Sequence, residues 1–190
     1  QESNSAHGIV AIGSFALCKN TSGDNNTAVG PYTLFANTTA SNNTAVGLCS
    51  LTANTTASNS VAVGCGALED NTIGDQNTAV GGTALGDNTE GEYNAAFGYN
   101  ALRKNTTADN NAAFGYYALA CNTTGTNNVA VGKGAAQANT TGNNNIAIGL
   151  DALCVNQTGT RNTGIGTDAL RNNTGDCNTA IGSISLDSNT

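Results

Sequence analysis

The sequence predicts an all-β fold, a parallel β-roll or β-solenoid of about eleven 17-residue coils with two short strands in each coil. A short apolar phrase that ends in glycine recurs eleven times in the 190 residues, and the step between successive glycines is 17 residues nine times in succession and then 16. Units that cannot bury their own apolar face must stack on their neighbours, which makes a solenoid. Residues 1–190 are expected to form one domain, with coils anchored at Gly13, Gly30, Gly47, Gly64, Gly81, Gly98, Gly115, Gly132, Gly149, Gly166 and Gly182.

The first strand of each coil is predicted directly before this glycine, which we number position 0. Position −1 is Val, Ile or Phe in every unit, position −2 is Ala in ten, and position −4 is Asn in nine. Side chains alternate across a strand, so positions −3 and −1 share one face and positions −4 and −2 share the other. Both faces vary little between units. We therefore expect one face to line a thin interior of Ala and Leu, and the other to meet a partner, most simply another copy of this chain.

The second strand is predicted at the Ala-Leu pair, for example Ala67-Leu68, because position +4 is Leu in ten units. The glycine supplies a tight bend, and segments such as Asn122-Thr123-Thr124-Gly125 supply the longer return. Frequent Gly and Asn and the wrong apolar spacing argue against a helix. Eleven coils stacked at about 4.8 Å give a rod roughly 50 Å long. The single 16-residue step is expected to shorten a return loop near residues 174–177 and to leave the strands in register.

The composition excludes several classes of protein. Only 10% of the residues are charged and Met and Trp are absent, so a thick core of large side chains is not expected. The net charge of −7 and the scattered basic residues argue against nucleic-acid binding. No apolar run reaches about 20 residues, so no membrane span is predicted. The chain starts at Gln1 without an apolar signal segment, as expected for a mature protein or a piece of a longer one.

No reaction centre is visible in the sequence. His7 is the one histidine and the carboxylates are scattered, which does not make a catalytic triad. The six cysteines show no C-x-x-C spacing, which argues against a zinc site. The sequence therefore predicts a protein that is not an enzyme and has no catalytic residues, metal or cofactor.

The cysteines predict one disulfide and an oxidising setting. Cys49 lies two residues after its glycine and Cys65 lies one residue after the next, so adjacent coils would place their Cα atoms about 6 Å apart. The other four are expected to be free thiols or cross-links between subunits, and an extracellular location is favoured. These four are Cys18, Cys121, Cys154 and Cys177.

Two columns of asparagine run through the repeat, at positions −4 and +7. Stacked asparagines can form a hydrogen-bonded ladder, which is the structural interpretation of the first column. The second often creates Asn-x-Ser/Thr, the acceptor for N-linked sugar. Ile73, Glu90 and Gly175 break this sequon while the Asn stays, so turn geometry also fixes the Asn, and glycosylation remains open. The glycosylation candidates are Asn20, Asn37, Asn54, Asn105, Asn122, Asn139 and Asn156 in this column, and Asn25, Asn42 and Asn172 outside it.

Aromatic residues gather in units six and seven. Exposed tyrosine can stack on a sugar ring, so the tyrosines form a candidate ligand patch, whereas Phe97 and Phe114 replace Val and are expected to fill the local core. The candidate ligand residues are Tyr93, Tyr99, Tyr116 and Tyr117.

The repeat resembles those of surface-fibre proteins. Asn43-Thr44-Ala45-Val46-Gly47 and Asn145-Ile146-Ala147-Ile148-Gly149 resemble the head repeats of trimeric autotransporter adhesins, and the longer phrase from Gly115 to Gly125 is similar to repeats in tail-fibre-like surface proteins. The resemblance covers nearly the whole chain. It implies a left-handed parallel β-roll, often trimeric, that serves in extracellular fibres and adhesins.

Three functions remain open on these grounds. The first is a structural subunit of an extracellular fibre or filament at a cell surface or on a virion, which associates with copies of itself as a trimer or an end-to-end filament. The second is an adhesin or a head that binds a receptor or cell-surface carbohydrate. The third is ice binding, which is disfavoured because only five of eleven units carry Thr on the first strand.

Overall fold

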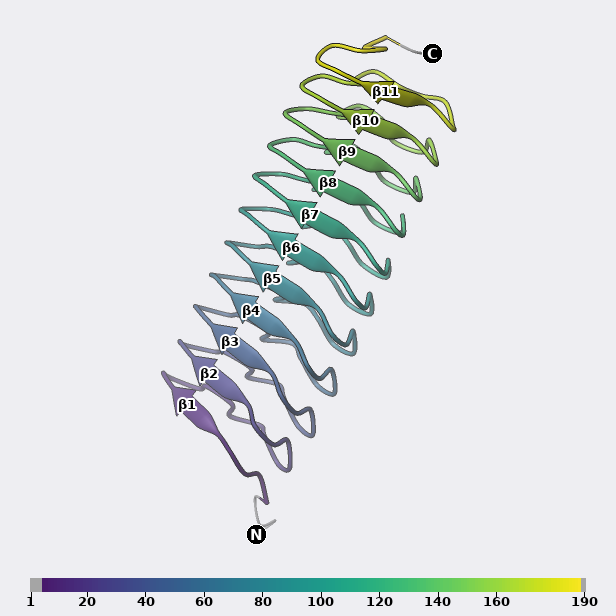
Figure 1. The fold of residues 1–190 in the computed structure, drawn as a ribbon. Helices are drawn as coiled ribbons and strands as arrows, with labels where there is room; N and C mark the ends of the chain where they lie inside the picture. The colour runs from purple at the N-terminus through teal and green to yellow at the C-terminus, as the bar shows by residue number, and fades with distance from the viewer. Residues whose placement is uncertain (1–4, 189–190) are drawn as a thin grey trace.

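A computed structural model describes residues 5–188 of the chain as a single sheet of eleven parallel strands. The strands lie in chain order from β1 to β11, one above another along the rod (Figure 1). The predicted β-solenoid is confirmed, and each coil contributes one strand. The strands are β1 (Val10–Ile12), β2 (Thr27–Val29), β3 (Thr44–Val46), β4 (Val61–Val63), β5 (Thr78–Val80), β6 (Ala95–Phe97), β7 (Ala112–Phe114), β8 (Val129–Val131), β9 (Ile146–Ile148), β10 (Thr163–Ile165) and β11 (Thr179–Ile181).

Each strand pairs with the next so that equivalent positions of the repeat meet. Ala62 of β4 pairs with Ala79 of β5, for example. The shortened unit obeys the same rule, because Thr163 pairs with Thr179 across the 16-residue step. The missing residue is therefore absorbed outside the strands, as the sequence predicts.

The interior is thin and is filled by Ala and Leu. Position −2 of each strand from β2 to β11 is buried, and in the coils of β2 to β10 so are the residues at positions +3 and +4, such as Ala67 and Leu68. Positions −3 and −1 point outward, since neither is buried in any of the eleven strands. The alternation predicted for the first strand is therefore confirmed.

The repeated glycine is fixed by both conformation and space. Its φ angle ranges from 123° at Gly13 to 145° at Gly115, a region that L side chains rarely adopt. A Cβ atom at Gly64 would also lie 2.5 Å from the carbonyl oxygen of Gly81 in the next coil. No larger residue fits here, which explains why position 0 does not vary.

The predicted second strand is a turn, so the expectation of two strands per coil is wrong. Ala67 and Leu68 are both buried, and consecutive residues of a strand cannot both point inward. The chain solves this with positive φ angles, as at Tyr32 (58°) and Leu34 (49°). The backbone N–H of Tyr32 donates to Ser14 of the previous coil and that of Leu34 to Ser50 of the next. Bonding between coils thus continues without an extended backbone.

Two asparagines close each coil from inside. In the second coil, Nδ2 of Asn26 (position −4) and Nδ2 of Asn37 (position +7) donate to the same carbonyl oxygen, that of Ala40, at 2.7 and 3.1 Å. The two amides come from opposite sides of the coil, so the shared carbonyl ties the strand to the return loop. The same bridge recurs in the third and the fifth to tenth coils.

The asparagines also bond from coil to coil, so both columns are ladders. At position +7, Nδ2 of Asn54 donates to Oδ1 of Asn37 at 2.8 Å. At position −4, Oδ1 of Asn26 accepts the backbone N–H of Asn43 at 2.9 Å. The interpretation of the asparagines as structural ladders and turn formers is confirmed, apart from Asn189, which lies outside the described residues.

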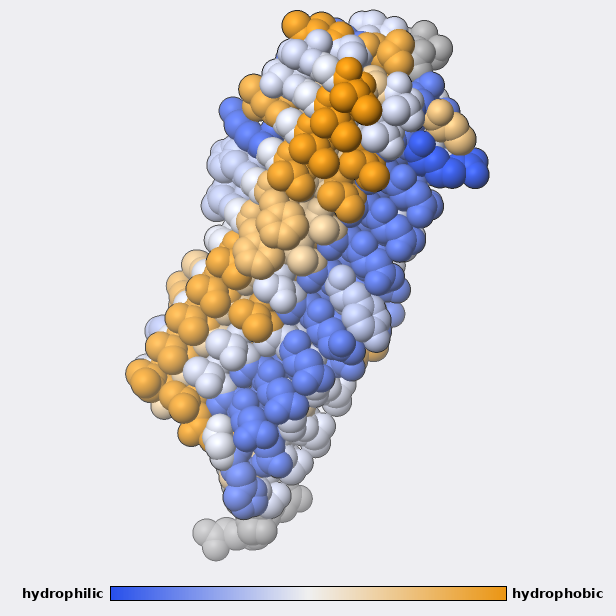
Figure 2. Space-filling view, in the orientation of Figure 1, coloured by the Kyte–Doolittle hydropathy of each residue, from blue (hydrophilic) through white to orange (hydrophobic). Residues whose placement is uncertain are grey.

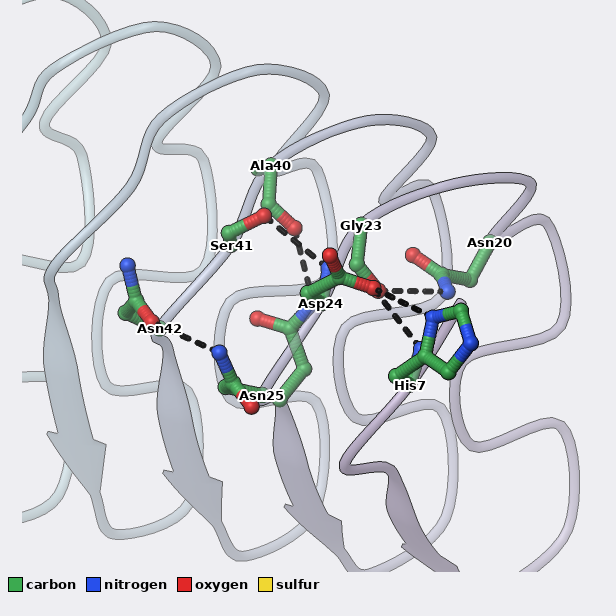
Figure 3. A network of polar contacts seen from close by, with 9 residues as sticks. His7, Asn20, Gly23, Asp24, Asn25, Ala40, Ser41 and Asn42 are labelled. Atoms are coloured by element: carbon green, nitrogen blue, oxygen red, sulfur yellow. Dashed lines mark hydrogen bonds and ion pairs between the residues drawn. The ribbon is translucent and has the colours of Figure 1, made fainter. Parts of the chain in front are cut away.

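A second set of contacts runs along the outer edge before each strand, at positions +11 and +12, which we call the amide edge. Figure 3 shows its beginning, where Oδ1 of Asp24 accepts the backbone N–H of His7 at 2.7 Å and the backbone N–H of Asp24 donates to Ser41 Oγ at 2.9 Å. Asn25 Nδ2 donates to Asn42 Oδ1 at 3.4 Å. These side chains satisfy backbone groups of neighbouring coils where the strand ladder does not reach.

We predict that Asn88→Ala lowers the free energy of unfolding by about 3 kcal/mol. Asn88 is buried, and its Nδ2 donates to Asn71 Oδ1 and the Gly91 carbonyl while its Oδ1 accepts from Asn105. Its removal leaves buried partners unpaired, each at a cost of roughly 1–3 kcal/mol. Urea denaturation followed by circular dichroism measures the change. The control Asn172→Ala removes an exposed amide and is expected to shift stability by less than about 0.5 kcal/mol; equal effects would contradict the buried bridge.

Candidate interaction surface

The outward side chains of the eleven strands form one continuous surface, which we call the outer sheet face. It comprises two residues from each strand, at positions −3 and −1. All are Val, Ile, Phe, Ala or Thr, and none is charged. Figure 2 shows a band of hydrophobic residues running along the rod in the region of the strands. An uncharged, largely apolar surface of this length is a candidate interaction site.

Charge lies beside this face and not on it. The amide edge carries Asp24, Asp75, Glu92, Asp109 and Asp176, and several of these carboxylates accept backbone N–H bonds from the previous coil. In Figure 2 a hydrophilic band follows the hydrophobic one along the rod. The acidic groups therefore lie along one edge of the outer sheet face, and the face itself stays uncharged.

The two phenylalanines lie on the outer sheet face, so the expectation that they fill the core is wrong. Phe97 and Phe114 occupy position −1 of β6 and β7, which points outward, and they are 36% and 41% exposed. Their rings stack on each other with centroids 4.9 Å apart and planes 5° apart. One face of each ring is covered by the other ring. The two phenylalanines are therefore exposed as a single stacked block.

Three of the four tyrosines in the candidate ligand patch come together beside this block. Tyr99 stacks on Tyr116 with centroids 5.7 Å apart, and Tyr117 meets Tyr116 edge-on at 4.5 Å. Tyr99 and Tyr116 are each 51% exposed. Desolvation, together with the Tyr117 hydroxyl, raises the pKa of Tyr116 above its ordinary value. Tyr93 lies apart on the amide edge, where Gln76 Nε2 donates to its hydroxyl at 3.4 Å.

A second aromatic cluster near the N-terminus was missed by the sequence analysis. Phe15 stacks on Tyr32 with centroids 5.2 Å apart, and Phe35 contacts both rings. Lys19 Nζ lies 4.8 Å from the centroid of the Phe35 ring. Phe15 and Tyr32 share position +2 of adjacent coils, so comparing the repeat column by column would have found them.

The predicted disulfide is absent, because all six cysteines are free thiols. Cys49 and Cys65 lie on adjacent coils but at different positions of the repeat, +2 and +1. The backbone N–H of Gly66, the true counterpart of Cys49, bonds to the carbonyl of Leu48, the counterpart of Cys65. Neighbouring positions of one coil project in different directions, so adjacency of coils alone does not bring two thiols together.

The structure divides the glycosylation candidates into two groups. The seven asparagines at position +7 use Nδ2 for hydrogen bonds inside the coil, and all except the half-buried Asn20 are buried. Sugar on that nitrogen would break the bridge, so these seven are rejected as glycosylation sites of the folded protein. Asn25, Asn42 and Asn172 are exposed and remain candidates.

Within the described range of residues 5–188, no group of three or more His, Cys, Asp or Glu side chains is placed to hold a metal ion. No helix within this range has the length and apolar character to cross a membrane.

Comparison of the chain with protein-family models, with curated proteins and with solved structures finds no match.

We predict six free thiols per chain, which Ellman titration of the denatured, unreduced protein measures. In the folded protein, Cys154 is expected to be alkylated more slowly than the exposed Cys65 at pH 8. Burial, and then the charge of Asp151, raises the pKa of the Cys154 thiol, so less of the reactive thiolate is present. Its rate should therefore increase with rising pH. Four titratable thiols and a peptide joining Cys49 to Cys65 would contradict the structure.

We predict that expression in a host that attaches N-linked sugar yields glycopeptides at Asn25, Asn42 or Asn172, and none at the seven position +7 asparagines. The Asn25 and Asn42 amides donate only long bonds at the exposed surface, whereas the position +7 amides donate shorter bonds inside the coil. Peptide mass spectrometry before and after deglycosylation measures occupancy. Substantial sugar at Asn54 or Asn122 in folded protein would refute the inner position of these amides.

Proposed function

We propose that this chain is a structural rod, the subunit of an extracellular fibre or filament, which associates with copies of itself through the outer sheet face. The observation that carries the proposal is the outer sheet face itself, which is uncharged and open to water along all eleven strands. The resemblance to the repeats of fibre and adhesin proteins supports the same role and an extracellular place.

The size of the face suits self-association. Eleven strands at about 4.8 Å and a width of about 13 Å give roughly 650 Å² in projection. Side-chain relief raises the accessible area above this value, toward the roughly 800 Å² that each partner buries in a standard interface. Residues of position +1, such as Leu48 and Leu150, add exposed apolar area along one side.

The interior supports a mechanical role. Backbone and asparagine hydrogen bonds join every coil to its neighbours, so the rod has no hinge segment between the first and last strand. The free energy of unfolding is then approximately the sum of a term for each coil and a term for each contact between neighbouring coils. A rod of this kind keeps its outer groups at fixed spacing, which suits a fibre subunit.

A receptor-binding head is the second candidate, and the exposed tyrosines favour it. Tyr99, Tyr116 and Tyr117 offer hydroxyls and ring edges to a ligand. Their stacking on one another leaves less ring face for a sugar. Electron micrographs separate the two functions, since long uniform filaments support the fibre subunit and discrete short rods support the head.

We predict that wild-type protein sediments as an oligomer and that Val80→Asp weakens its association by roughly 30-fold or more. Val80 points outward from β5, so the new carboxylate does not enter the interior but would be buried unpaired between copies. Sedimentation velocity over a concentration series measures the shift. Asn172→Asp adds the same charge at position +6, on an exposed turn away from both the outer sheet face and the amide edge, and is expected to associate normally. Monomeric wild-type protein at every concentration would overturn the proposal.

A further inference from the structure

Two adjacent strands depart from the rest of the outer sheet face in a correlated way. Position −1 is Phe in β6 and β7 and is Val or Ile in the other nine strands. Position −3 is Ala in the same two strands and is Thr, Val or Ile in the others. The largest and the smallest outward side chains therefore occur together, at the same two levels of the rod.

This pairing shapes the surface. Phe97 and Phe114 stack into one block along the −1 column and remain 36% and 41% exposed. Ala95 and Ala112 beside them carry only a methyl group outward. By side-chain size, the −1 column therefore stands higher at these two levels, which we call the ridge, and the −3 column stands lower, which we call the hollow.

We infer that a second copy of this chain covers the outer sheet face with the two rods parallel and related by a two-fold axis along the rod. Phe97 and Phe114 of each copy then fill the hollow at Ala95 and Ala112 of the partner subunit. This inference rests on the proposed function, and it adds the orientation and register of the pair.

The symmetry explains why ridge and hollow match. Rotation by 180° about an axis along the rod keeps each coil at its level and exchanges the two columns, so position −1 of one copy faces position −3 of the other. A two-fold axis across the rod would make the rods antiparallel and place the −1 column on the −1 column. Because β6 is the middle strand, Phe97 would then meet the partner's Phe97, and the rings would hold the sheets apart.

The charges favour the same orientation. Parallel rods place the acidic amide edge of one copy beside the position +1 column of the other, which contains Lys133 and no acidic residue. Antiparallel rods would place the two amide edges side by side, with Asp75 opposite Asp109 and Glu92 opposite the same residue of the second copy. Of the arginines and lysines, only Arg161 would then lie opposite an acidic group, Asp24. Parallel rods also bring Tyr93 of the amide edge to the side where the partner's Tyr99 lies. Tyr93, which is apart from the other tyrosines within one chain, then belongs to the contact between the two copies.

The test exchanges the two columns. The variant Ala95→Phe/Phe97→Ala/Ala112→Phe/Phe114→Ala moves the ridge to position −3 and the hollow to position −1. All four side chains point outward, so the interior is unchanged. The exchanged chain remains complementary to itself, and its dissociation constant is expected to stay within about threefold of wild type. Mixed pairs of wild type and variant place Phe on Phe and are expected to be weaker by about tenfold or more.

Native mass spectrometry of ¹⁵N-labelled wild type mixed with unlabelled variant counts the pairs and their subunits. Mixed pairs as abundant as self-pairs would overturn the matched columns while leaving self-association intact. Particles of three subunits would overturn the two-fold axis. Monomers alone would overturn the proposed function, and this inference with it.

Cross-linking provides a second readout that does not depend on affinity. In chains whose six cysteines are replaced by Ser, Thr78→Cys protein mixed with Val80→Cys protein is expected to oxidise to a cross-linked pair, because the two positions face each other between parallel rods. Val80→Cys alone, and Asp70→Cys on an exposed turn, are expected to stay uncross-linked. Efficient cross-linking of Val80→Cys to itself would contradict the exchange of columns.

Discussion

The structure depends on one backbone carbonyl in most coils and the two asparagine amides that converge on it. A coil of 17 residues has no room for a core of large side chains, and the hydrophobic part of its interior holds only Ala and Leu. The amides hold the strand and the return loop of a coil together, which burial of the small hydrophobic core alone would not do. They also link each ring to the next, so the bonds that shape a coil set its register as well. In the fourth coil, where Ser60 replaces the asparagine at position −4, the Gly74 carbonyl still accepts two amides, one from Asn71 and one from Asn77 of the next coil.

The inward and outward positions of the repeat differ in how strongly the fold restricts their residue type. Inside, most positions keep the same side chain from coil to coil, because each faces its equivalent in the coils on either side. Outside, the strand residues vary among Val, Ile, Thr, Ala and Phe, because the rod alone does not constrain them. The left-handed residues of the turn, such as Leu34 and Leu68, each cost about 1–2 kcal/mol of backbone strain. Burial of the side chain and the bonds to neighbouring coils offset this cost.

The sequence was enough to predict the solenoid, the first strand and its inward and outward sides, because a 17-residue period and a two-residue alternation are direct signatures of geometry. It was not enough for the second half of the coil. There the neighbours Ala67 and Leu68 both point inward, which requires positive φ at a residue that normally avoids it. The same gap explains the errors in the candidate sites. The pairing of Cys49 with Cys65 rested on their adjacent coils and did not consider that positions +2 and +1 project in different directions. The placement of Phe97 in the core rested on its hydrophobicity and did not consider that position −1 points outward from the strand. The sequons at Asn54 and Asn122 carry no signal of burial, since only the structure shows that their amides are engaged.

The shortened unit shows where the repeat tolerates change in length. The residue is lost between Asn173 and Gly175, yet both Asn162 and Asn173 still reach the Gly175 carbonyl, and β10 and β11 pair without a shift. The return loop therefore lost a residue without a shift of the strands, because the Asn162 and Asn173 amides at its base keep their hydrogen bonds. A foreign peptide grafted at this one loop would be displayed at a fixed height on the rod without a shift of β10 against β11, which makes the chain a scaffold for presentation at a defined level.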